Sequence, residues 1–432
     1  MIEMIESPHA GLQSAFEALE SGSQSEEVMR LRAEAFERFC ALGWPTRKHE
    51  AWKYTAVTPI ARAELRAVPQ AANDEDLADR LEEAGVDRTA GCLVFVDGRF
   101  SSSLSTTPHG FTAEPLSSSA ESAMDSSVEE EQHAFVALNQ ALFADGARIH
   151  VPAKTRIDRP VELVFVQRSK DIASHPRVSI HLEREARLSV VQRHLDFGAG
   201  ASLENSYTEI TLDQAAELDH YVLVDGTPEA FHVGVQRYSV ERDARLRLHT
   251  FAFGGALVRC EADVAFRAEG AEVDLGGLYV ADESEHVDCR TFIDHAVPHC
   301  ASRQVYHGAI GGKGHGVFNG EVLVRTDAQK SEAHQTNRNL LLSDTAKADT
   351  KPQLEIFADD VKCSHGATIG QLDPDALFYL RSRALGEDEA RMILTRAFAG
   401  TITDQARPLA LQQTLEQLLA TRLGGRDRRN QT

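Results

Sequence analysis

A recurring strand-and-turn unit between residues 148 and 370 is the feature that most restricts how this chain can fold. The unit is an alanine followed two residues later by leucine or valine. Its copies are spaced by 15, 15, 28 and 27 residues, close to one or two multiples of 14, and begin at Ala186, Ala201, Ala216, Ala244 and Ala271. A short strand and a tight turn repeated at a nearly fixed distance predict a stacked β-solenoid. The spacing alone leaves a β-sandwich open as the alternative.

Helix-like sequence precedes this region. Val28, Leu31, Ala35 and Phe39 recur at spacings of three and four, which predicts a helix with one apolar stripe. The helix is expected to stop at 43–45, because a proline disfavours helical geometry in the residue before it.

A strand and a turn are predicted at 92–100, and residues 101–132 are rich in serine and are predicted to form a loop. A helix at 135–143 then leads into the strands. We therefore expect a mainly β chain with three parts. They are an N-terminal helical domain with a serine-rich loop (1–134), a β-helix core (135–372) and a C-terminal helical domain (373–432).

The C-terminal domain contains clear signals for the start and the end of helices. Asp373 is a good N-cap and Pro374 suits the first position of a helix, which should end near Gly386. A second helix should begin at Glu387 and stop at Gly400, and a third should begin at Pro408. The apolar face expected for the second helix consists of Ala390, Ile393, Leu394, Ala397 and Phe398.

Composition narrows the class of partner. The 432 residues carry a formal charge of −21, so we expect no binding to nucleic acid or to an anionic membrane. No apolar run approaches the roughly 18 residues of a membrane span, and the N-terminus lacks the pattern of a signal peptide. The six cysteines are scattered without a CxxC pair, which disfavours a zinc ribbon or a disulfide framework. A cytoplasmic location is the resulting expectation.

Cys363 and His365 form a compact thiol–imidazole pair. If their segment is extended, residues i and i+2 point to the same face, so a thiolate and an imidazole would be presented together. Both groups can ligate iron, but a closed iron–sulfur cluster usually takes four protein ligands. A transient site completed by a partner fits this shortage, and a buried structural pair is the alternative.

The sequence around this pair resembles that of the SufB/SufD family of iron–sulfur cluster assembly proteins. The resemblance is strongest in DVKCSHGAT (360–368) and QTNRNLLLS (335–343). It extends to GWPTRKHEAWKYT (43–55), LNQALFADG (138–146) and LRSRALG (380–386). We expect Trp52 and Tyr54 of the third motif to anchor the helical domain on its neighbour.

The resemblance implies a right-handed parallel β-helix core and membership of a complex with a SufB-like β-helix subunit and a SufC-like ABC ATPase. The family carries that ATPase on its C-terminal helices. SufB proteins have a cysteine near the position of 337–339 and an acidic residue with histidine near 363–365. Here the first segment has no cysteine and the second reads Cys-Ser-His, so the sequence is similar to SufD. Cys363 and His365 would then ligate a transient iron–sulfur cluster shared with the SufB-like partner.

The resemblance also implies that this chain is not an enzyme and binds no nucleotide. The glycine-rich stretch 308–314 lacks the GxxxxGK[ST] pattern of a phosphate-binding loop, so ATP hydrolysis would belong to the partner. Whether a flavin joins the complex, and how many copies of each chain assemble, stays open.

Two other functions remain open from the residues. One is a carbohydrate-active β-helix enzyme, although aromatic residues make up only 6% of the chain. The other is a homodimeric structural β-helix protein that uses the same sheet edge. A second metal site is a further possibility among His286, Cys289, His295, His299, Cys300, His307 and His315.

Overall fold

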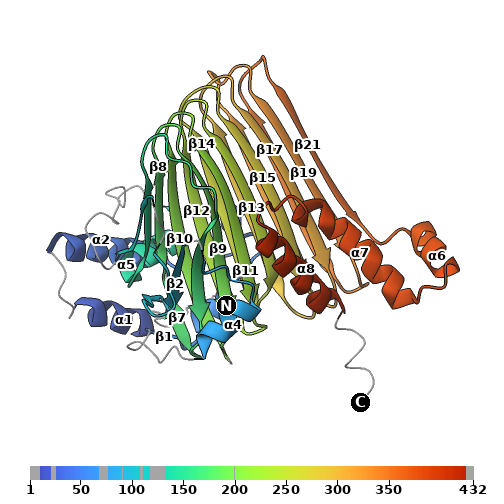
Figure 1. Ribbon diagram of the computed structural model, residues 1–432, viewed down its shortest axis with the longest axis horizontal. Helices are drawn as coiled ribbons and strands as arrows, with labels where there is room; N and C mark the ends of the chain where they lie inside the picture. Colours follow the sequence, from blue (N-terminus) through green and yellow to red (C-terminus); the bar gives the residue numbers. More distant parts are fainter. Residues whose placement is uncertain are drawn as a thin grey trace.

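The strands of this protein stack as a parallel β-solenoid of about eight turns, with helices at the N-terminal and C-terminal ends (Figure 1). Hydrogen-bonded neighbours within each sheet are mostly two strands apart in the sequence and run parallel. The solenoid is therefore confirmed, and the β-sandwich alternative is wrong. The computed structural model describes residues 10–20, 26–67, 76–89, 91–107, 110–116, 132–198 and 200–424.

Each turn of the solenoid contributes one strand to each of two sheets that enclose the interior. Sheet A contains β1 (Arg66–Ala67), β4 (Thr112–Pro115), β5 (Gly146–Val151), β7 (Ile172–Ser174), β8 (Arg177–Leu182), β10 (Ser202–Leu212), β12 (Ala230–Val240), β14 (Leu257–Phe266), β16 (His286–His295), β18 (His315–Val324) and β20 (Lys347–Ile356). Sheet B contains β2 (Cys92–Val96), β3 (Arg99–Phe100), β6 (Val161–Gln167), β9 (Arg187–Asp196), β11 (Glu217–Gly226), β13 (Arg245–Gly254), β15 (Glu272–Ala281), β17 (Ala301–Ile310), β19 (Glu332–Leu341) and β21 (Lys362–Gly370).

Strands also occur in the part of the chain before residue 134. β2 and β3 match the strand and turn predicted at 92–100, and β2 pairs with β6 of the solenoid. β4 lies within the predicted serine-rich loop and pairs with β5. The rest of that predicted loop from residue 117 to residue 131 lies outside the described residues.

The repeated alanines mark one corner of the solenoid. Four of them, at 186, 216, 244 and 271, are fully buried and point into the core, one full turn apart. Ala201 instead lies at the start of β10, at a different corner of the solenoid. The alanine repeat predicted from the sequence therefore joins residues of two different corners. A residue with positive φ precedes the buried small residue at six successive turns: Glu185–Ala186, Ala215–Ala216, Asp243–Ala244, Gly270–Ala271, His299–Cys300 and Lys330–Ser331.

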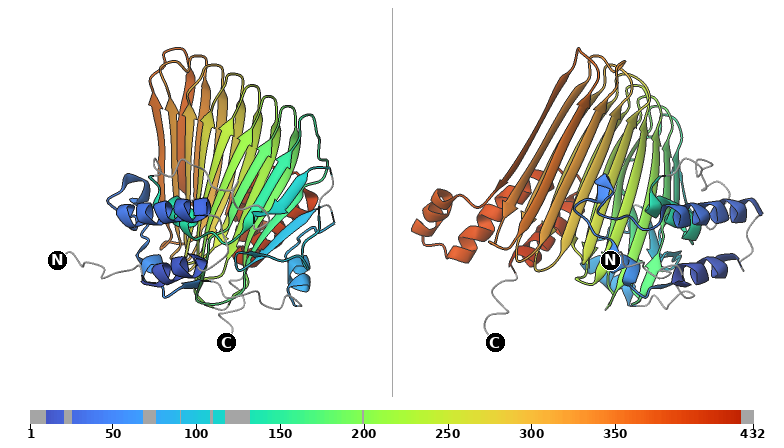
Figure 2. Two further views of the ribbon diagram at one scale, coloured as in Figure 1. Left: turned by 90° about the vertical axis from the view of Figure 1, so that its left-hand side faces the viewer. Right: turned by 180° about the vertical axis from the view of Figure 1, so that it is seen from behind.

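The nine described helices lie outside the solenoid. They are α1 (Ala10–Glu20), α2 (Glu26–Leu42), the 3₁₀ helix η1 (Glu50–Trp52), α3 (Thr58–Arg62), α4 (Leu77–Glu83), α5 (Ala134–Leu142), α6 (Pro374–Ser382), α7 (Glu387–Thr403) and α8 (Leu409–Gly424). Figure 2 shows α1, α2 and α5 beside the first turns, away from α6–α8. No helix of the described residues has the length and apolarity that a membrane crossing requires.

α2 confirms the predicted apolar stripe, since Val28, Leu31, Ala35 and Phe39 are all buried. Gly43 ends the helix with φ of +66°, a conformation that glycine adopts without steric cost. α2 packs with α1 and α5 in one apolar cluster.

Trp52 fixes the N-terminal segment to the outer face of sheet A. Its side chain is buried, and the Arg259 guanidinium lies 3.9 Å from the centroid of its ring. Arg259 is itself fully buried, donates a hydrogen bond of 2.9 Å to the carbonyl of Ala51 and pairs with Glu261 at 2.7 Å and with Asp288. The predicted anchoring role of Trp52 therefore rests on a buried charge as well as on apolar packing.

Tyr54, the other predicted anchor, is only half-buried, and Lys53 Nζ lies 5.6 Å from its ring centroid. Thr55 makes the stronger attachment. Its side chain is fully buried, and its hydroxyl donates a hydrogen bond to Asp288, the same carboxylate that pairs with Arg259.

α6 and α7 begin where the sequence predicts, but α7 ends later than predicted. Asp373 caps α6 by accepting a hydrogen bond of 2.9 Å from the Asp375 amide. α7 begins at Glu387 as expected but runs through Gly400 to Thr403. Gly400 was wrongly predicted as a stop because a glycine inside a helix is tolerated when the surrounding residues pack.

The buried face of α7 matches the prediction in part, since Ala390 is fully buried and Phe398 stacks on His307 of β17 at a centroid distance of 4.5 Å. Thr395, Ala399 and Ile402 are buried against sheet B and α8, whereas Ile393 is 40% exposed and Ala397 is exposed. The side of α7 that contacts sheet B is buried, and the side that carries Ile393 and Ala397 is exposed.

α7 and α8 cover the outer face of sheet B rather than the end of the solenoid. Their buried residues form one cluster with outward-facing side chains of β9, β11, β13, β15 and β17. α6 projects away from the solenoid and has no buried residue (Figure 1). The C-terminal helices therefore do not cap the last turn, and within the described residues β20 and β21 have no strand or helix stacked on their outer edge.

We predict that Arg259→Met lowers the free energy of unfolding by about 3–5 kcal/mol, because Glu261 and Asp288 lose the main cation that compensates their burial. Urea denaturation of the full chain measures the change.

The matched control is Arg303→Met, which removes an exposed arginine that pairs with Asp274 at 2.9 Å. Exposed pairs contribute about 0–1 kcal/mol, so this variant should unfold close to wild type. Equal destabilisation by the two changes would contradict the anchoring role of Arg259.

Candidate functional site

Cys363 and His365 lie on β21, the last strand of sheet B. β21 is extended, as the prediction requires, and pairs in register with β19, so that Cys363 lies opposite Ala333 and His365 lies opposite Gln335. Alternation along a strand places the two residues on the same face.

The environments of the two groups differ. Cys363 is partly buried and packs against the apolar cluster that fills the solenoid, whereas His365 is exposed. Ser364 lies between them and points to the other face, where its hydroxyl is 2.8 Å from His334 Nδ1. Cys363 and His365 therefore point toward the interior side of the last turn, and Ser364 points toward the outer side of sheet B.

Partial burial raises the pKa of the Cys363 thiol, and a backbone hydrogen bond at Ala333 opposes this effect. The thiol is therefore protonated near neutral pH. A metal ion that binds the sulfur has to displace this proton, because the thiolate is the ligand.

The pair lacks further ligands within its own chain. Among the described residues, the one group of three side chains able to hold a metal ion lies elsewhere, at His194, Glu204 and His232. Two ligands on one strand cannot close a tetrahedral site or an iron–sulfur cluster.

The strands that carry this site are open edges. β20 ends sheet A and β21 ends sheet B, so each has a hydrogen-bonded neighbour on one side only. Most of β21 is exposed, with 49% of Ile369 accessible, and Ile356 and Phe357 at the end of β20 are 41% and 62% exposed. Unpaired backbone groups beside apolar side chains are suited to pairing with another chain.

The other histidines and cysteines singled out in the sequence have structural contacts. His299 and Cys300 occupy a corner of the solenoid, as the positive-φ residue and the buried residue that follows it. Cys289 is buried in the core. The remaining contacts are His286 Nε2 to Thr55 Oγ1 at 2.9 Å, His295 Nε2 to Ser302 Oγ at 2.8 Å, His307 Nδ1 to the Phe398 carbonyl at 3.0 Å and His315 Nε2 to Asp349 Oδ2 at 2.7 Å.

None of these residues joins a group of three metal-ligating side chains within the described residues. The group that does form, His194, Glu204 and His232, was missed in the sequence. Its members come from three strands and have no short spacing, so only the register of the solenoid brings them together.

Two family models match the sequence. The model described as "SufBD protein N-terminal region" matches residues 11–163, and the model described as "SUF system FeS cluster assembly, SufBD core domain" matches residues 165–398.

Curated relatives agree with these matches. The iron–sulfur cluster assembly protein SufD of Escherichia coli (strain K12) is 30% identical over 387 residues, which cover 89% of this chain and 90% of the relative. A SufBD family protein of Synechocystis is 30% identical over 427 residues, with 94% and 93% covered. SufD of Bacillus subtilis (strain 168) is 26% identical over 285 residues, with 65% of each chain covered.

We predict that iodoacetamide alkylates Cys363 more slowly at neutral pH in the folded chain than in the urea-unfolded chain. Burial raises the thiol pKa in the fold, so the reactive thiolate is scarcer there and increases toward alkaline pH. Mass spectrometry of a Cys40→Ser protein, which lacks the other accessible thiol, measures the rate. The rate is followed on the peptide that contains residue 363, because unfolding also exposes Cys92, Cys260, Cys289 and Cys300. In a Cys40→Ser, Cys363→Ser control that peptide stays unlabelled, and faster labelling of Cys363 in the folded chain at neutral pH would contradict the prediction.

Proposed function

The chain belongs to the SufBD family and is a SufD-like component of iron–sulfur cluster assembly, and we propose the following contacts and site for it. Its open last turn pairs with the last turn of a SufB-like β-helix subunit. Cys363 and His365 supply part of the ligand set for a nascent iron–sulfur cluster at that interface. The C-terminal helices bind a SufC-like ABC ATPase.

The uncovered edge of β21 is the observation that carries this proposal. A solenoid stabilises each strand by hydrogen bonds to the turns on either side, and the last turn lacks one of these neighbours. A second solenoid that extends both sheets would satisfy the free groups of β20 and β21 and would cover Ile356, Phe357 and Ile369. In the absence of that partner, the same edge would pair with a second copy of this chain.

The position of the Cys363–His365 pair supports a shared site. Both residues lie on the terminal strand, so groups of a chain docked on this edge would approach them directly. The partner, sulfide or solvent supplies the remaining ligands, which makes the cluster transient rather than a stored cofactor. Closing the interface also brings cationic iron to the protonated thiol, and the metal releases its proton.

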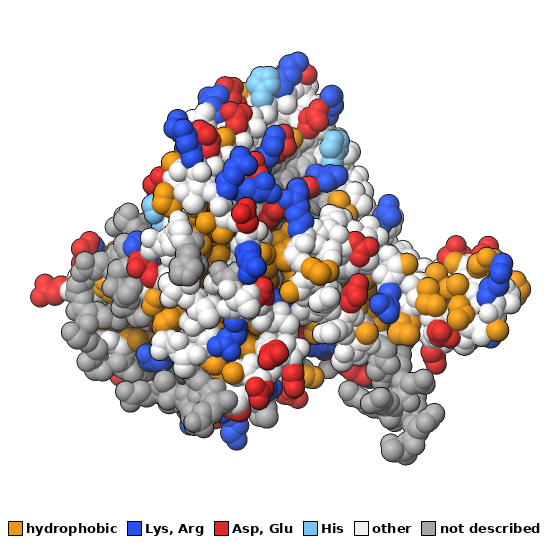
Figure 3. All heavy atoms as spheres, viewed as in Figure 1, with side chains coloured by type: hydrophobic (Ala, Val, Ile, Leu, Met, Phe, Trp, Pro, Cys, Tyr) orange, Lys and Arg blue, Asp and Glu red, His pale blue; other side chains and the backbone are white. Residues whose placement is uncertain are grey.

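An apolar surface on the C-terminal helices supports the docking of the ATPase. Phe378 and Tyr379 of α6 are 73% and 56% exposed, and Ile393 of α7 is 40% exposed. Figure 3 shows hydrophobic side chains gathered on the projecting α6. Exposed aromatic side chains on an element without a buried face are typical of a protein interface.

In this proposal the chain has no catalytic activity and binds no nucleotide, and its SufC-like partner hydrolyses ATP. The six cysteines are free in the structure, which supports a reducing compartment such as the cytoplasm. The carbohydrate-active alternative gains no support, because the exposed large aromatic side chains of the described residues lie on α6 and at Phe357 rather than along a face of a sheet.

We predict that Ile369→Arg abolishes co-purification with the SufB-like subunit and leaves the ATPase bound, because the added charge is buried at the paired edge. Phe378→Asp with Tyr379→Ser should have the opposite effect. Co-expression of the three full-length chains, followed by affinity purification, measures both. Arg303→Ala, on the outer face of sheet B, is the surface control. Retention of both partners by both variants would contradict the assignment of the two surfaces.

We predict that Cys363→Ser and His365→Ala leave the complex assembled but weaken its cluster loading by about tenfold or more, since the loss of outer-sphere partners alone costs about 10–100-fold in metal affinity. Anaerobic reconstitution followed by visible absorption measures the loading. Ser364→Ala is the matched control on the opposite face of the same strand and should load like wild type. Unchanged loading in both ligand variants would exclude the proposed role of the pair.

A further inference from the structure

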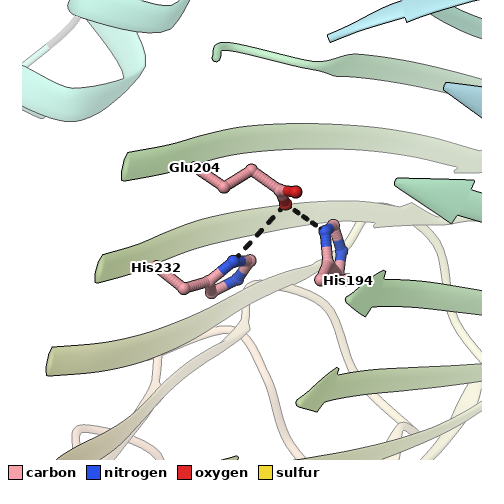
Figure 4. Close-up of side chains that lie close together, drawn as sticks. All are labelled: His194, Glu204 and His232. Carbon is pink, nitrogen blue, oxygen red and sulfur yellow. Dashed lines mark hydrogen bonds and ion pairs between the residues drawn. The ribbon is translucent and has the colours of Figure 1, made fainter. Parts of the chain in front are cut away.

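Three metal-ligating side chains converge inside the first turns of the solenoid, far from β21. Glu204 of β10 and His232 of β12 are register partners on adjacent strands of sheet A, and His194 reaches them from β9 of the facing sheet. All three are buried, and their candidate ligand atoms lie within 4.8 Å of one another. Figure 4 shows both imidazoles directed at the carboxylate.

The carboxylate lies between the two rings. Glu204 Oε1 is hydrogen-bonded to His194 Nδ1 and lies 3.4 Å from His232 Nδ1. Its second oxygen is 3.5 Å from the side-chain amide nitrogen of Gln167. Both ring nitrogens therefore approach the same carboxylate oxygen.

The protein leaves polar atoms of this cluster without partners. His232 Nε2 and Gln167 Oε1 are buried and have no hydrogen-bond partner. Buried polar groups of native proteins are almost always satisfied, and an unsatisfied one indicates a function, a bound water or a bound ion. The network is therefore incomplete as a purely structural hydrogen-bond cluster.

We propose that His194, Glu204 and His232 form a binding site for a first-row divalent metal ion of the zinc or ferrous iron type. Two imidazole nitrogens and one carboxylate oxygen are a donor set that both ions accept, and a fourth position is left for water. The hard cations Ca²⁺ and Mg²⁺ require six or more oxygen ligands, which this cluster does not offer.

Apolar side chains surround part of this cluster. Phe165 stacks on the His194 ring at a centroid distance of 5.2 Å, and Val224 and Val258 lie beside His194 and His232 in the next turn. Among the described residues, the group holds three histidine or carboxylate ligands and no fourth. Low coordination numbers favour zinc and related ions.

Ligation through Nδ1 requires the proton of each ring to lie on Nε2. His232 Nε2 has no hydrogen-bond partner, and His194 Nε2 has one. The Gln192 side-chain amide nitrogen lies 3.0 Å from His194 Nε2. Rotation of this amide by half a turn presents its oxygen to the ring, so Gln192 is the residue that positions His194 for the metal.

The experiment uses the full chain expressed in medium with added Zn²⁺, in a Cys363→Ser, His365→Ala background that removes the other candidate metal ligands. We expect one equivalent of zinc by elemental analysis. Removal of zinc by 1,10-phenanthroline should lower the melting temperature, and added Zn²⁺ should restore it. Replacement by Co²⁺ should give visible ligand-field bands without the near-ultraviolet band of a thiolate ligand.

Glu204→Gln in the same background should lose the zinc, whereas His295→Asn, which alters a buried histidine outside the cluster, should retain it. If Glu204→Gln does not fold, the spectrum and the thermal shift of the parent protein decide. Absence of zinc and of a Co²⁺ spectrum in the parent overturns the proposal, as does retention of the full equivalent by folded Glu204→Gln. Ferrous iron added anaerobically to the stripped protein shows which ion is preferred.

Discussion

The hydrogen-bonded ladder between successive turns is the interaction on which this structure depends. A strand of a parallel stack satisfies its backbone groups through the strands above and below, so each turn needs a neighbour on both sides. The helices do not supply this neighbour at the last turn, because α7 and α8 pack on the outer face of sheet B and α6 projects away. Within the described part of the chain, the ladder therefore ends without a further neighbour at β20 and β21, and the thiol–imidazole pair lies at that end.

The outer faces of the two sheets, in contrast, are covered by other parts of the chain. Sheet A is covered by an N-terminal segment held by Trp52 and the buried Arg259, and sheet B is covered by two helices. The interior is filled by inward-pointing apolar side chains, with a buried residue at the same corner of successive turns. Because these surfaces are satisfied within the chain, the open edge and the apolar side of α6 and α7 are left as the places where other proteins can add contact area.

Local features of the fold could be predicted from the sequence, and features that join distant segments could not. The alanine repeat, the stripe on α2 and the cap at Asp373 each depend on residues within a few positions of one another. The extended strand that places Cys363 and His365 on one face could be predicted for the same reason, since residues i and i+2 of a strand point the same way. The stripe of α7 was predicted only in part, because sheet B decides which side of that helix is buried. The triad of His194, Glu204 and His232 depends on the register of two sheets, which no spacing in the sequence reveals.

The bare last turn also bears on how the cell must make this protein. An extended edge with free amides and carbonyls adheres to any strand of suitable length, including one of an unfinished or misfolded chain. Chains whose last turn stays bare are therefore prone to aggregate with one another. This liability follows from the architecture alone, and it would hold even if the chain never met a metal ion.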